Sequence, residues 1–376
     1  MIVKYSQLFL ISVTLLVAAC DSAESPKKTQ NPIVEKKTLD SKDNVSLDIP
    51  FITLRNLTGS DNPENYFGDE RDSVRAGVCQ VSHKPIKALK PIAQQMPFYI
   101  PDNKIKLDVI QELSSRELWR DLKQSSYGHR PLMYVHGFNI SFNKGCRRAS
   151  LLQENLGLAG RLLLFSWPSD GAFLNYTRDE ADLYWSVDLM QQSLADMIKQ
   201  FGRGGFDVVA HSLGTRGAFL ALVRLAHAKW GNKPLLNQLV LIAPDIDADI
   251  FKQYLPKISS LASNITIYVS DNDSPLALSQ EVHGYPRLGK TGPHLQDMQR
   301  VEIIDITNTG MRSASGHLYH LYNNSVINDL DQLLNQGKSA HQRQNLTQVS
   351  ENYWQLQLTE SPADHDSQKK KNIAVE

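Results

Sequence analysis

Ser212 has the sequence context of a nucleophile. It lies just after the apolar run Asp207–Ala210, and residues 213–229 after it are expected to form a helix. A serine in a sharp turn between a buried strand and a helix presents its hydroxyl group for attack on a carbonyl carbon. The turn needs small residues two positions before and after the serine, which here are Ala210, where glycine is usual, and Gly214. The alternative is a serine that only caps the following helix.

A second feature concerns the negative charge that develops on a carbonyl oxygen during acyl transfer. Two backbone N–H groups aimed at this oxyanion stabilise it. We expect Leu213, directly after the serine, to supply one of them. We expect Phe138 to supply the other, because it follows an earlier apolar run and Gly137 beside it lets the backbone approach a substrate closely. We interpret His136 in the same loop as a structural histidine rather than a catalytic one.

Such a serine also needs a histidine as general base and a carboxylate that orients this histidine. The chain order for this kind of turn is serine, acid, histidine, so both partners should follow Ser212. We prefer His317 as the base because it follows the last apolar run closely, and His320 is the alternative. The acid should follow the run Ile265–Val269, where Asp271 and Asp273 qualify, and Asp245 and Asp247 after the preceding run are alternatives. The candidates, in order of preference, are Asp273, Asp271 and Asp245.

Short apolar runs alternate with longer stretches of helical character along the middle of the chain. The predicted strands are Leu132–Val135, Leu162–Phe165, Asp207–Ala210, Leu239–Ala243, Ile265–Val269 and Val301–Ile306. The predicted helices are 145–157, 179–201, 213–229, 246–260 and 325–336. Continuous apolar runs of this length are typical of strands buried on both faces, so we expect an α/β fold with a mostly parallel central sheet and helices on both faces. Strands near 51–55, 78–82 and 97–100 are expected to extend one edge in antiparallel orientation.

The composition excludes some classes of function. The 376 residues include 40 Lys and Arg and 40 Asp and Glu, so the net charge is 0 and the excess of positive charge that favours nucleic-acid binding is missing. Hydrophobic residues make up 41% and charged residues 21%, as in ordinary globular proteins. Chemistry carried by a serine, a histidine and a carboxylate needs neither a metal ion nor an organic cofactor, and we expect none.

The first residues resemble a bacterial lipoprotein signal. An apolar run, Leu8–Ala19, is too short for a lasting membrane span and ends in small residues before Cys20. The resemblance implies that residues 1–19 are removed and that Cys20 is lipidated, which anchors the protein to a membrane facing the periplasm. Asp21 weakly favours the inner membrane. The alternative is an ordinary secretory signal that happens to contain a cysteine.

Composition divides the rest of the chain into three parts. Residues 20–48 are polar and lysine-rich and are expected to form a flexible tether, residues 49–336 the folded domain, and residues 337–376 a polar, disordered tail. Within that tail, Tyr353–Leu358 is a stretch that can dock on the domain.

Two cysteines remain besides the one in the signal. Cys79 and Cys146 would meet oxidising conditions beyond the membrane, where disulfides form. A disulfide between them and two separate buried thiols are both compatible with the sequence.

Several ordered motifs resemble the bacterial α/β-hydrolase family named domain of unknown function 900. They are YVHGFN (134–139), LLFSWPSDG (163–171), VVAHSLGTRG (208–217), LIAPDIDADIF (241–251), YVSDNDSPLALS (268–279), RLG (287–289) and SGHLY (315–319), and GVCQV (77–81) also resembles the N-terminal part of the family. The resemblance covers roughly residues 50–335. It implies an α/β-hydrolase fold with Ser212 as nucleophile, and it aligns Asp273 and His317 with the other two members of the triad.

These features predict a serine hydrolase of esters or similar small acyl compounds at the cell envelope. The alternative is a binding or scaffolding protein that keeps the fold without activity. Trp167, Tyr176 and Asp179 follow a predicted strand and would line the substrate pocket or pack in the core. The sequence lacks a long apolar lid segment, which weakly disfavours bulky lipid substrates, and it does not indicate an oligomeric state.

Overall fold

One mixed sheet organises the part of the chain that the computed structural model describes, which is residues 44–85, 104–171, 175–227, 230, 233–296, 298–309 and 317–358. The strands are β1 Val45–Leu57, β2 Phe67–His83, β3 Ile105–Leu113, β4 Leu132–Val135, β5 Leu162–Ser166, β6 Asp207–His211, β7 Leu236–Ile242, β8 Ala262–Val269, β9 Glu302–Asp305, β10 Leu346–Ser350 and β11 Tyr353–Leu356. The helices are α2 Ser115–Ser125, α3 Phe142–Asn155, α4 Tyr176–Phe201, α5 Leu213–Ala226, α6 Ala248–Ile258, α7 Ser274–His283, α8 Tyr319–Tyr322 and α9 Asn324–Leu334. Short 3₁₀ turns are η1 Pro63–Asn65, η4 Pro293–Leu295, η5 Thr307–Thr309 and η7 Ala340–Gln342.

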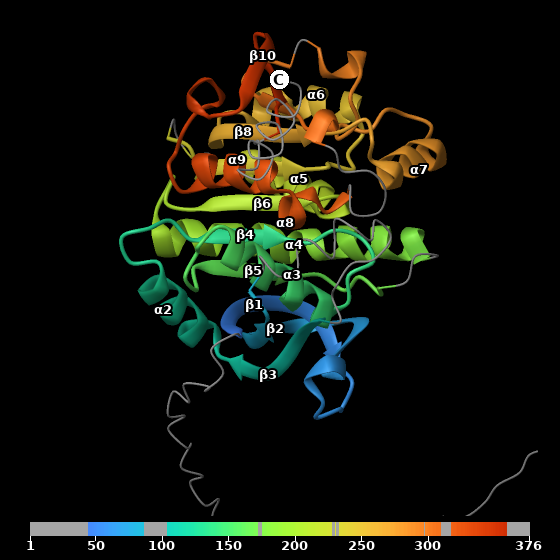
Figure 1. Cartoon of the computed structure of the whole chain (residues 1–376). Helices are drawn as coiled ribbons and strands as arrows, with labels where there is room; N and C mark the ends of the chain where they lie inside the picture. Colours follow the sequence, from blue (N-terminus) through green and yellow to red (C-terminus); the bar gives the residue numbers. More distant parts are fainter. Residues whose placement is uncertain are drawn as a thin grey trace, which may run out of the picture. The chain divides into compact units, whose positions relative to one another are not determined.

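The strand order is β10-β11-β9-β8-β7-β6-β4-β5-β1-β2-β3, and Figure 1 shows β10 and β3 at opposite edges of the sheet. From β11 to β1 neighbouring strands pair in parallel, whereas β10 and the pair β2–β3 run antiparallel to their neighbours. The expected mostly parallel sheet is therefore confirmed. The next two strands in the chain, β5 and β6, lie on opposite sides of β4. Ligands of open α/β sheets bind at such a switch point, beyond the carboxyl ends of the strands.

Helices cover both faces of the sheet, as expected. Alternate residues of β4 show this, because Met133 and Val135 pack into one apolar cluster while Leu132 and Tyr134 pack into another. The first cluster contains side chains of α2, α4, α5 and α6. The second contains side chains of α3, α8 and α9. Strands buried on both faces explain why the central apolar runs lack polar alternation.

The N-terminal edge agrees in part with the prediction. The runs near 51–55 and 78–82 lie in β1 and β2, which pair antiparallel, but β1 also pairs in parallel with β5. The run 97–100 lies outside the described residues, as do the signal 1–19 and Cys20. Strand β1 already begins at Val45, so the predicted boundary between tether and domain lies a few residues too late. Among the described residues no helix is both long and apolar enough to cross a membrane.

The prediction of a disordered tail from residue 337 is wrong for its first part. Residues 340–356 form η7 and the hairpin β10–β11, and β11 joins the sheet in parallel beside β9. The physical reason is burial, since Trp354 and Leu356 are 4% and 0% exposed. The expected docking segment thus forms a strand, and residues 359–376 lie outside the described part of the chain.

The two cysteines that the sequence left open form a disulfide. Cys79 lies in β2 and Cys146 in α3, and both are completely buried. The bond joins positions 67 residues apart and fastens the antiparallel edge to the helix that follows β4.

Removal of this disulfide is expected to lower stability strongly. A cross-link that closes a loop of this length restricts the unfolded chain by roughly 4 kcal/mol. We expect urea unfolding of the Cys79→Ala/Cys146→Ala variant to show a free energy of unfolding lower by about that amount. The wild-type protein treated with a reductant serves as the matched control and should behave like the variant. Equal stability of oxidised and reduced protein would contradict the prediction.

Candidate active site

Ser212 lies in a strained turn between β6 and α5. Its backbone has φ 52° and ψ −128°, a combination that residues other than glycine rarely adopt and that marks functional positions. The Ser212 N–H donates to the carbonyl of Ile242 on β7 at 2.9 Å, and its own carbonyl accepts from the Thr215 hydroxyl at 2.6 Å. The strand-to-helix context predicted for this serine is therefore present.

Close packing around the turn explains why the residues two positions before and after the serine are small. A Cβ atom on Gly214 would lie 2.1 Å from the carbonyl oxygen of His136, so α5 could not begin so close to the end of β4 with any larger residue. Ala210 is completely buried in β6, and its methyl group fits there. The departure from glycine at this position is accommodated.

His317 and Asp273 are brought together across the carboxyl end of the sheet. Nδ1 of His317 lies 3.0 and 2.8 Å from the two carboxylate oxygens of Asp273. Asp273 is 1% exposed and also caps α7 by accepting from the N–H of Leu276 at 3.0 Å. Because a carboxylate only accepts at this distance, Nδ1 carries the proton and Nε2 is the basic nitrogen.

The two other candidate acids have different partners. Asp271 is exposed and pairs with Lys290 at 3.2 Å. Asp245 is buried and accepts from the Tyr176 hydroxyl at 2.5 Å and the Ser279 hydroxyl at 2.6 Å. Neither has a recorded contact with His317 in the described structure, so the geometry favours the carboxylate that was ranked first.

The loop after β4 lies directly against the candidate nucleophile. A Cβ atom on Gly137 would lie 2.8 Å from Cβ of Ser212, which explains the need for glycine here. Asn139 turns the chain with φ 60°. Phe138, between them, packs edge-on against Tyr176 with ring centroids 5.2 Å apart. Phe138, expected to supply one oxyanion N–H group, therefore directly follows a glycine that contacts the serine. Leu213, expected to supply the other, directly follows the serine itself.

His136 is buried and structural, as interpreted from the sequence. Its ring stacks on Trp167 at 5.1 Å, and its carbonyl accepts from the indole N–H at 2.9 Å. Burial lowers the pKa of His136 from 6.5 to about 3, so the ring is neutral at physiological pH. Trp167 is 0% exposed and packs in the core rather than lining a pocket.

His211 was not singled out from the sequence, although it directly precedes the serine. Its ring lies 4.7 Å from that of His317 and 4.5 Å from that of His320. Nε2 of His211 is 2.8 Å from the backbone carbonyl of His317, and because a carbonyl can only accept, this nitrogen carries the proton. His320, the alternative base, is completely buried, and its Nε2 lies 3.3 Å from the Tyr134 hydroxyl. Its ring packs against that of His211 with an interplanar angle of 34°.

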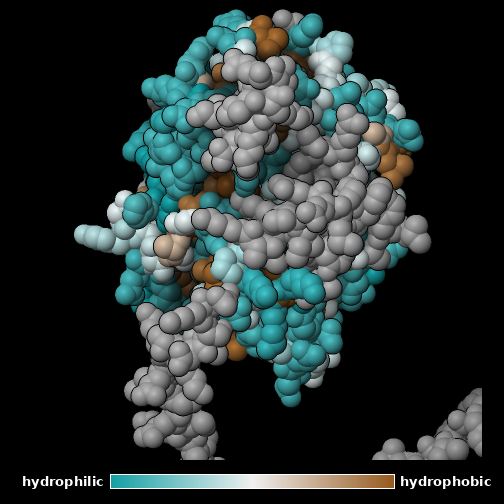
Figure 2. Space-filling view, in the orientation of Figure 1, coloured by the Kyte–Doolittle hydropathy of each residue, from teal (hydrophilic) through white to brown (hydrophobic). Residues whose placement is uncertain are grey.

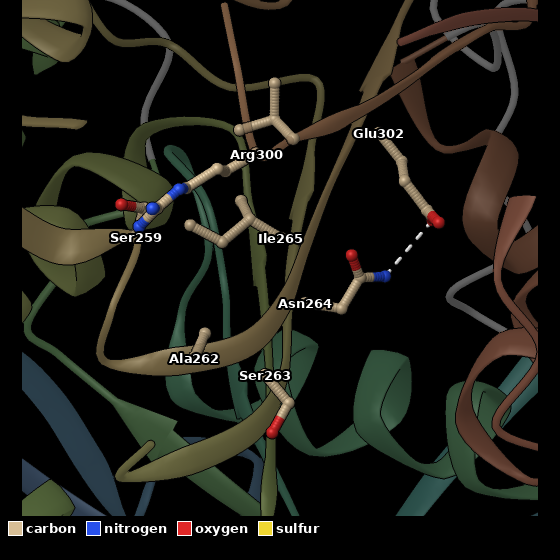
Figure 3. A pocket seen from close by; sticks show the side chains of 8 residues that line it. Ser259, Ala262, Ser263, Asn264, Ile265, Arg300 and Glu302 are labelled. Atoms are coloured by element: carbon tan, nitrogen blue, oxygen red, sulfur yellow. Dashed lines mark hydrogen bonds between the residues drawn. The ribbon is translucent and has the colours of Figure 1, made fainter. Parts of the chain in front are cut away.

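A cavity of about 280 Å³ lies away from this site. Figure 3 shows it between the first residues of β8 and β9, where the Asn264 side chain donates to Glu302 at 3.1 Å. These are the amino ends of parallel strands, whereas Ser212 follows the carboxyl end of β6. The cavity therefore lies at the opposite edge of the sheet from Ser212. Within the described residues, His, Cys, Asp and Glu side chains do not gather in any group of three that could hold a metal ion.

Residues 111–336 match the profile of a family described as "Alpha/beta hydrolase of unknown function (DUF900)". The chain belongs to this family. The match runs from the end of β3 to just beyond α9 and therefore includes Ser212, Asp273 and His317. The DUF900 description names no substrate, and no curated protein is detectably similar to the chain in sequence.

Solved structures with partial similarity include two esterases and one gene product without a stated activity. An esterase of Pyrobaculum calidifontis is 12% identical, covers 55% of this chain and 77% of its own, and has a TM-score of 0.33. A gene product of Listeria innocua is 15% identical, with 61% and 98% covered and a TM-score of 0.35. The Bacillus cereus carboxylesterase is 15% identical, with 57% and 91% covered and a TM-score of 0.29. The α/β-hydrolase assignment rests on the DUF900 match and the strand order.

The buried neutral histidines predict a loss of stability in acid. Burial lowers the pKa of His136 to about 3 and those of His211 and His320 well below 6.5. The unfolded chain therefore binds more protons below pH 6.5, and each histidine lowers the free energy of unfolding by up to about 1.4 kcal/mol per pH unit as the pH falls. Urea denaturation at pH 7.5 and pH 5.0 measures this.

Substitution of one buried histidine tests whether the buried histidines cause the loss of stability in acid. His320→Phe should reduce the pH dependence, whereas His129→Gln, which changes an exposed histidine, should leave it as in the wild type. A free energy of unfolding that does not change between pH 5.0 and 7.5 would refute the interpretation.

Proposed function

We propose that the protein is a serine hydrolase that cleaves esters or similar small acyl compounds at Ser212. The observation that carries this proposal is the His317–Asp273 pair at 2.8 Å, whose imidazole ring lies 4.7 Å from the ring of His211, the residue directly before a serine with strained backbone. A nucleophile, a base and a group that orients the base are the parts required for acyl transfer. The DUF900 match supports the fold that presents them.

The proposed reaction proceeds in two halves. Nε2 of His317 takes the proton of the Ser212 hydroxyl as Oγ attacks the substrate carbonyl carbon. The tetrahedral intermediate then collapses, the alcohol leaves with the proton from His317, and an acyl-enzyme remains. Water, deprotonated by the same imidazole, attacks the acyl carbon and releases the acid and the free serine. Asp273 stabilises the imidazolium in both halves.

Two backbone N–H groups are proposed to stabilise the oxyanion. Leu213 is the first residue of α5, so its N–H has no acceptor within the helix, and the helix N-terminus adds partial positive charge. Phe138 supplies the second N–H from the loop that touches Ser212. Loss of one such donor typically slows the chemical step by about 10²–10³-fold. No cofactor is required by this reaction.

Substitution of the triad tests the proposal. Ser212→Ala and Asp273→Asn should each lower kcat for p-nitrophenyl butyrate by at least ~10³-fold. Ser212→Ala should leave the melting temperature unchanged, so its loss of activity reports the chemistry. Asp271→Asn is the matched control, since it changes an exposed carboxylate two residues away.

A fluorophosphonate probe adds a test that does not depend on the choice of ester. The probe should label the wild type at Ser212 and fail to label Ser212→Ala. Full activity of the serine variant, or no labelling of the wild type, would contradict the proposal and favour a binding protein that keeps the fold.

We further propose that the enzyme is a lipoprotein of the cell envelope. The sequence before Cys20 motivates this, and the Cys79–Cys146 disulfide suits an oxidising compartment. In a bacterial host fed an alkyne-labelled fatty acid, the wild type should be labelled and membrane-bound, and Cys20→Ser should lose both properties. Asp21→Ser should keep the label and shift the protein toward the outer membrane. Equal labelling of Cys20→Ser would contradict the anchor.

A further inference from the structure

The strands before residue 111 lie outside the DUF900 match but are attached to the neighbourhood of Ser212. Strand β1 pairs in parallel with β5 through residues 51–53, and β2 then pairs antiparallel with β1. Three side chains of this hairpin region reach the oxyanion loop, residues 137–140, or the helix α3 that follows it. They are Arg55, Glu64 and Cys79.

Arg55 is a completely buried arginine that binds the oxyanion loop. Its guanidinium donates to the carbonyl of Ile140 at 2.6 Å and to that of Ser169 at 2.8 Å. It also donates to the hydroxyl of Ser166 at 3.0 Å and to the carbonyl of Gly68 at 3.1 Å. The side chain is 0% exposed. One planar group therefore connects β2, the end of β5, the loop after β5 and the oxyanion loop.

The N–H groups of the same loop are held from the opposite direction. The carboxylate of Asp179 in α4 accepts from the N–H of Asn139 at 3.1 Å. The hydroxyl of Ser169 accepts from the N–H of Ile140 at 2.9 Å and donates to Asp179. Both N–H groups after Phe138, and the carbonyl of Ile140, are thus fixed by buried polar side chains rather than by sheet hydrogen bonds.

Arg55 remains a cation at neutral pH in spite of its burial. Burial lowers the pKa of Arg55 from 12.5 to about 9, so the guanidinium stays protonated, and burial raises the pKa of Asp179. Nearby carboxylates stabilise the Arg55 cation, and they belong to Asp179, Asp69, Asp182 and Asp170. A charged network in the interior is costly unless its hydrogen bonds are made, and here Arg55 makes four.

Two further links hold the hairpin to α3. The Glu64 carboxylate in η1 pairs with Arg147 at 2.6 Å and accepts from the Asn143 amide at 3.1 Å. The Cys79–Cys146 disulfide reaches α3 at the residue directly before Arg147. Because α3 begins at Phe142, just after the loop, these links and Arg55 together restrict movement of the loop.

We propose that the β1–β2 hairpin is a positioning element of the active site, in which Arg55 fixes the oxyanion loop so that the Phe138 N–H points at the developing oxyanion. The inference rests on the proposed function for the role of Phe138. Oxyanion donors act through their fixed orientation, and small misplacement of a catalytic group lowers the rate strongly. Arg55 itself is a positioning residue and touches no substrate.

The test uses Arg55→Met, which keeps an unbranched side chain, shorter than that of arginine, and removes every donor. We expect kcat for p-nitrophenyl butyrate to fall about 10–100-fold with KM changed less than threefold, because ground-state binding does not use the oxyanion hole. Arg55→Lys, which keeps the charge and some donors, should recover part of the loss. Arg75→Met is the matched control from β2, where the arginine pairs with Glu112 at 3.0 Å, and should leave kcat unchanged.

A second readout does not depend on activity. Hydrogen exchange of the full-length protein should show faster exchange of the Asn139 and Ile140 amides in Arg55→Met than in the wild type, with unchanged exchange in β6 and β7. If Arg55→Met does not fold, Ser169→Ala, which deletes one hydroxyl of the same network, should give the same two effects.

The outcomes separate the two proposals. Faster loop exchange together with a fall in kcat supports the positioning role. Unchanged loop exchange in the folded variants, or a fall in activity that appears only in KM, overturns it. If the wild type cleaves no ester and resists the fluorophosphonate probe, the proposed function fails, and the exchange data alone decide whether Arg55 positions the loop.

Discussion

The positive φ angle of Ser212 is the constraint on which the arrangement of the site depends. This turn places the serine above the end of β6 and starts α5 immediately, which brings Gly214 within touching distance of the His136 carbonyl. The β4 loop must therefore pass directly over the serine, and Gly137 allows it to do so. A strained turn is tolerated only where its surroundings fix it, and here β4 and β7 on either side of β6 supply that support.

The parallel sheet collects the remaining parts because it aligns strand ends. The oxyanion loop follows β4, Ser212 follows β6, Asp273 follows β8 and His317 lies beyond β9, so residues far apart in the chain meet at one edge. The same alignment places the cavity between the starts of β8 and β9 at the opposite edge of the sheet from Ser212. The ring of His211, at the end of β6, then donates to the backbone carbonyl of His317 and joins the candidate base to that strand.

The sequence predicted the parts of the site that have local signals. Ser212, Asp273 and His317 each follow an apolar run, and that pattern can be recognised without the structure. Arg55 has no such signal, because its partner Ser166 is 111 residues away and only the β1–β5 pairing brings the two together. The hairpin β10–β11 was missed for a related reason, since its composition is polar and its stability comes from the burial of Trp354 beside β9.

The geometry of the oxyanion loop also explains why its support is polar. A loop that leaves β4 to pass over the serine cannot form sheet hydrogen bonds, so the N–H and carbonyl groups of Ile140 and the N–H of Asn139 need other partners. Each buried backbone group left without a partner would cost about 1–3 kcal/mol. An apolar side chain in place of Arg55 would fill the space but leave the Ile140 carbonyl without a donor. A shift of the loop that gave this carbonyl another donor would then lower the free energy. A buried arginine with donors in fixed directions removes that alternative. The strain at Ser212 and the charge at Arg55 are thus two consequences of holding one loop over one serine.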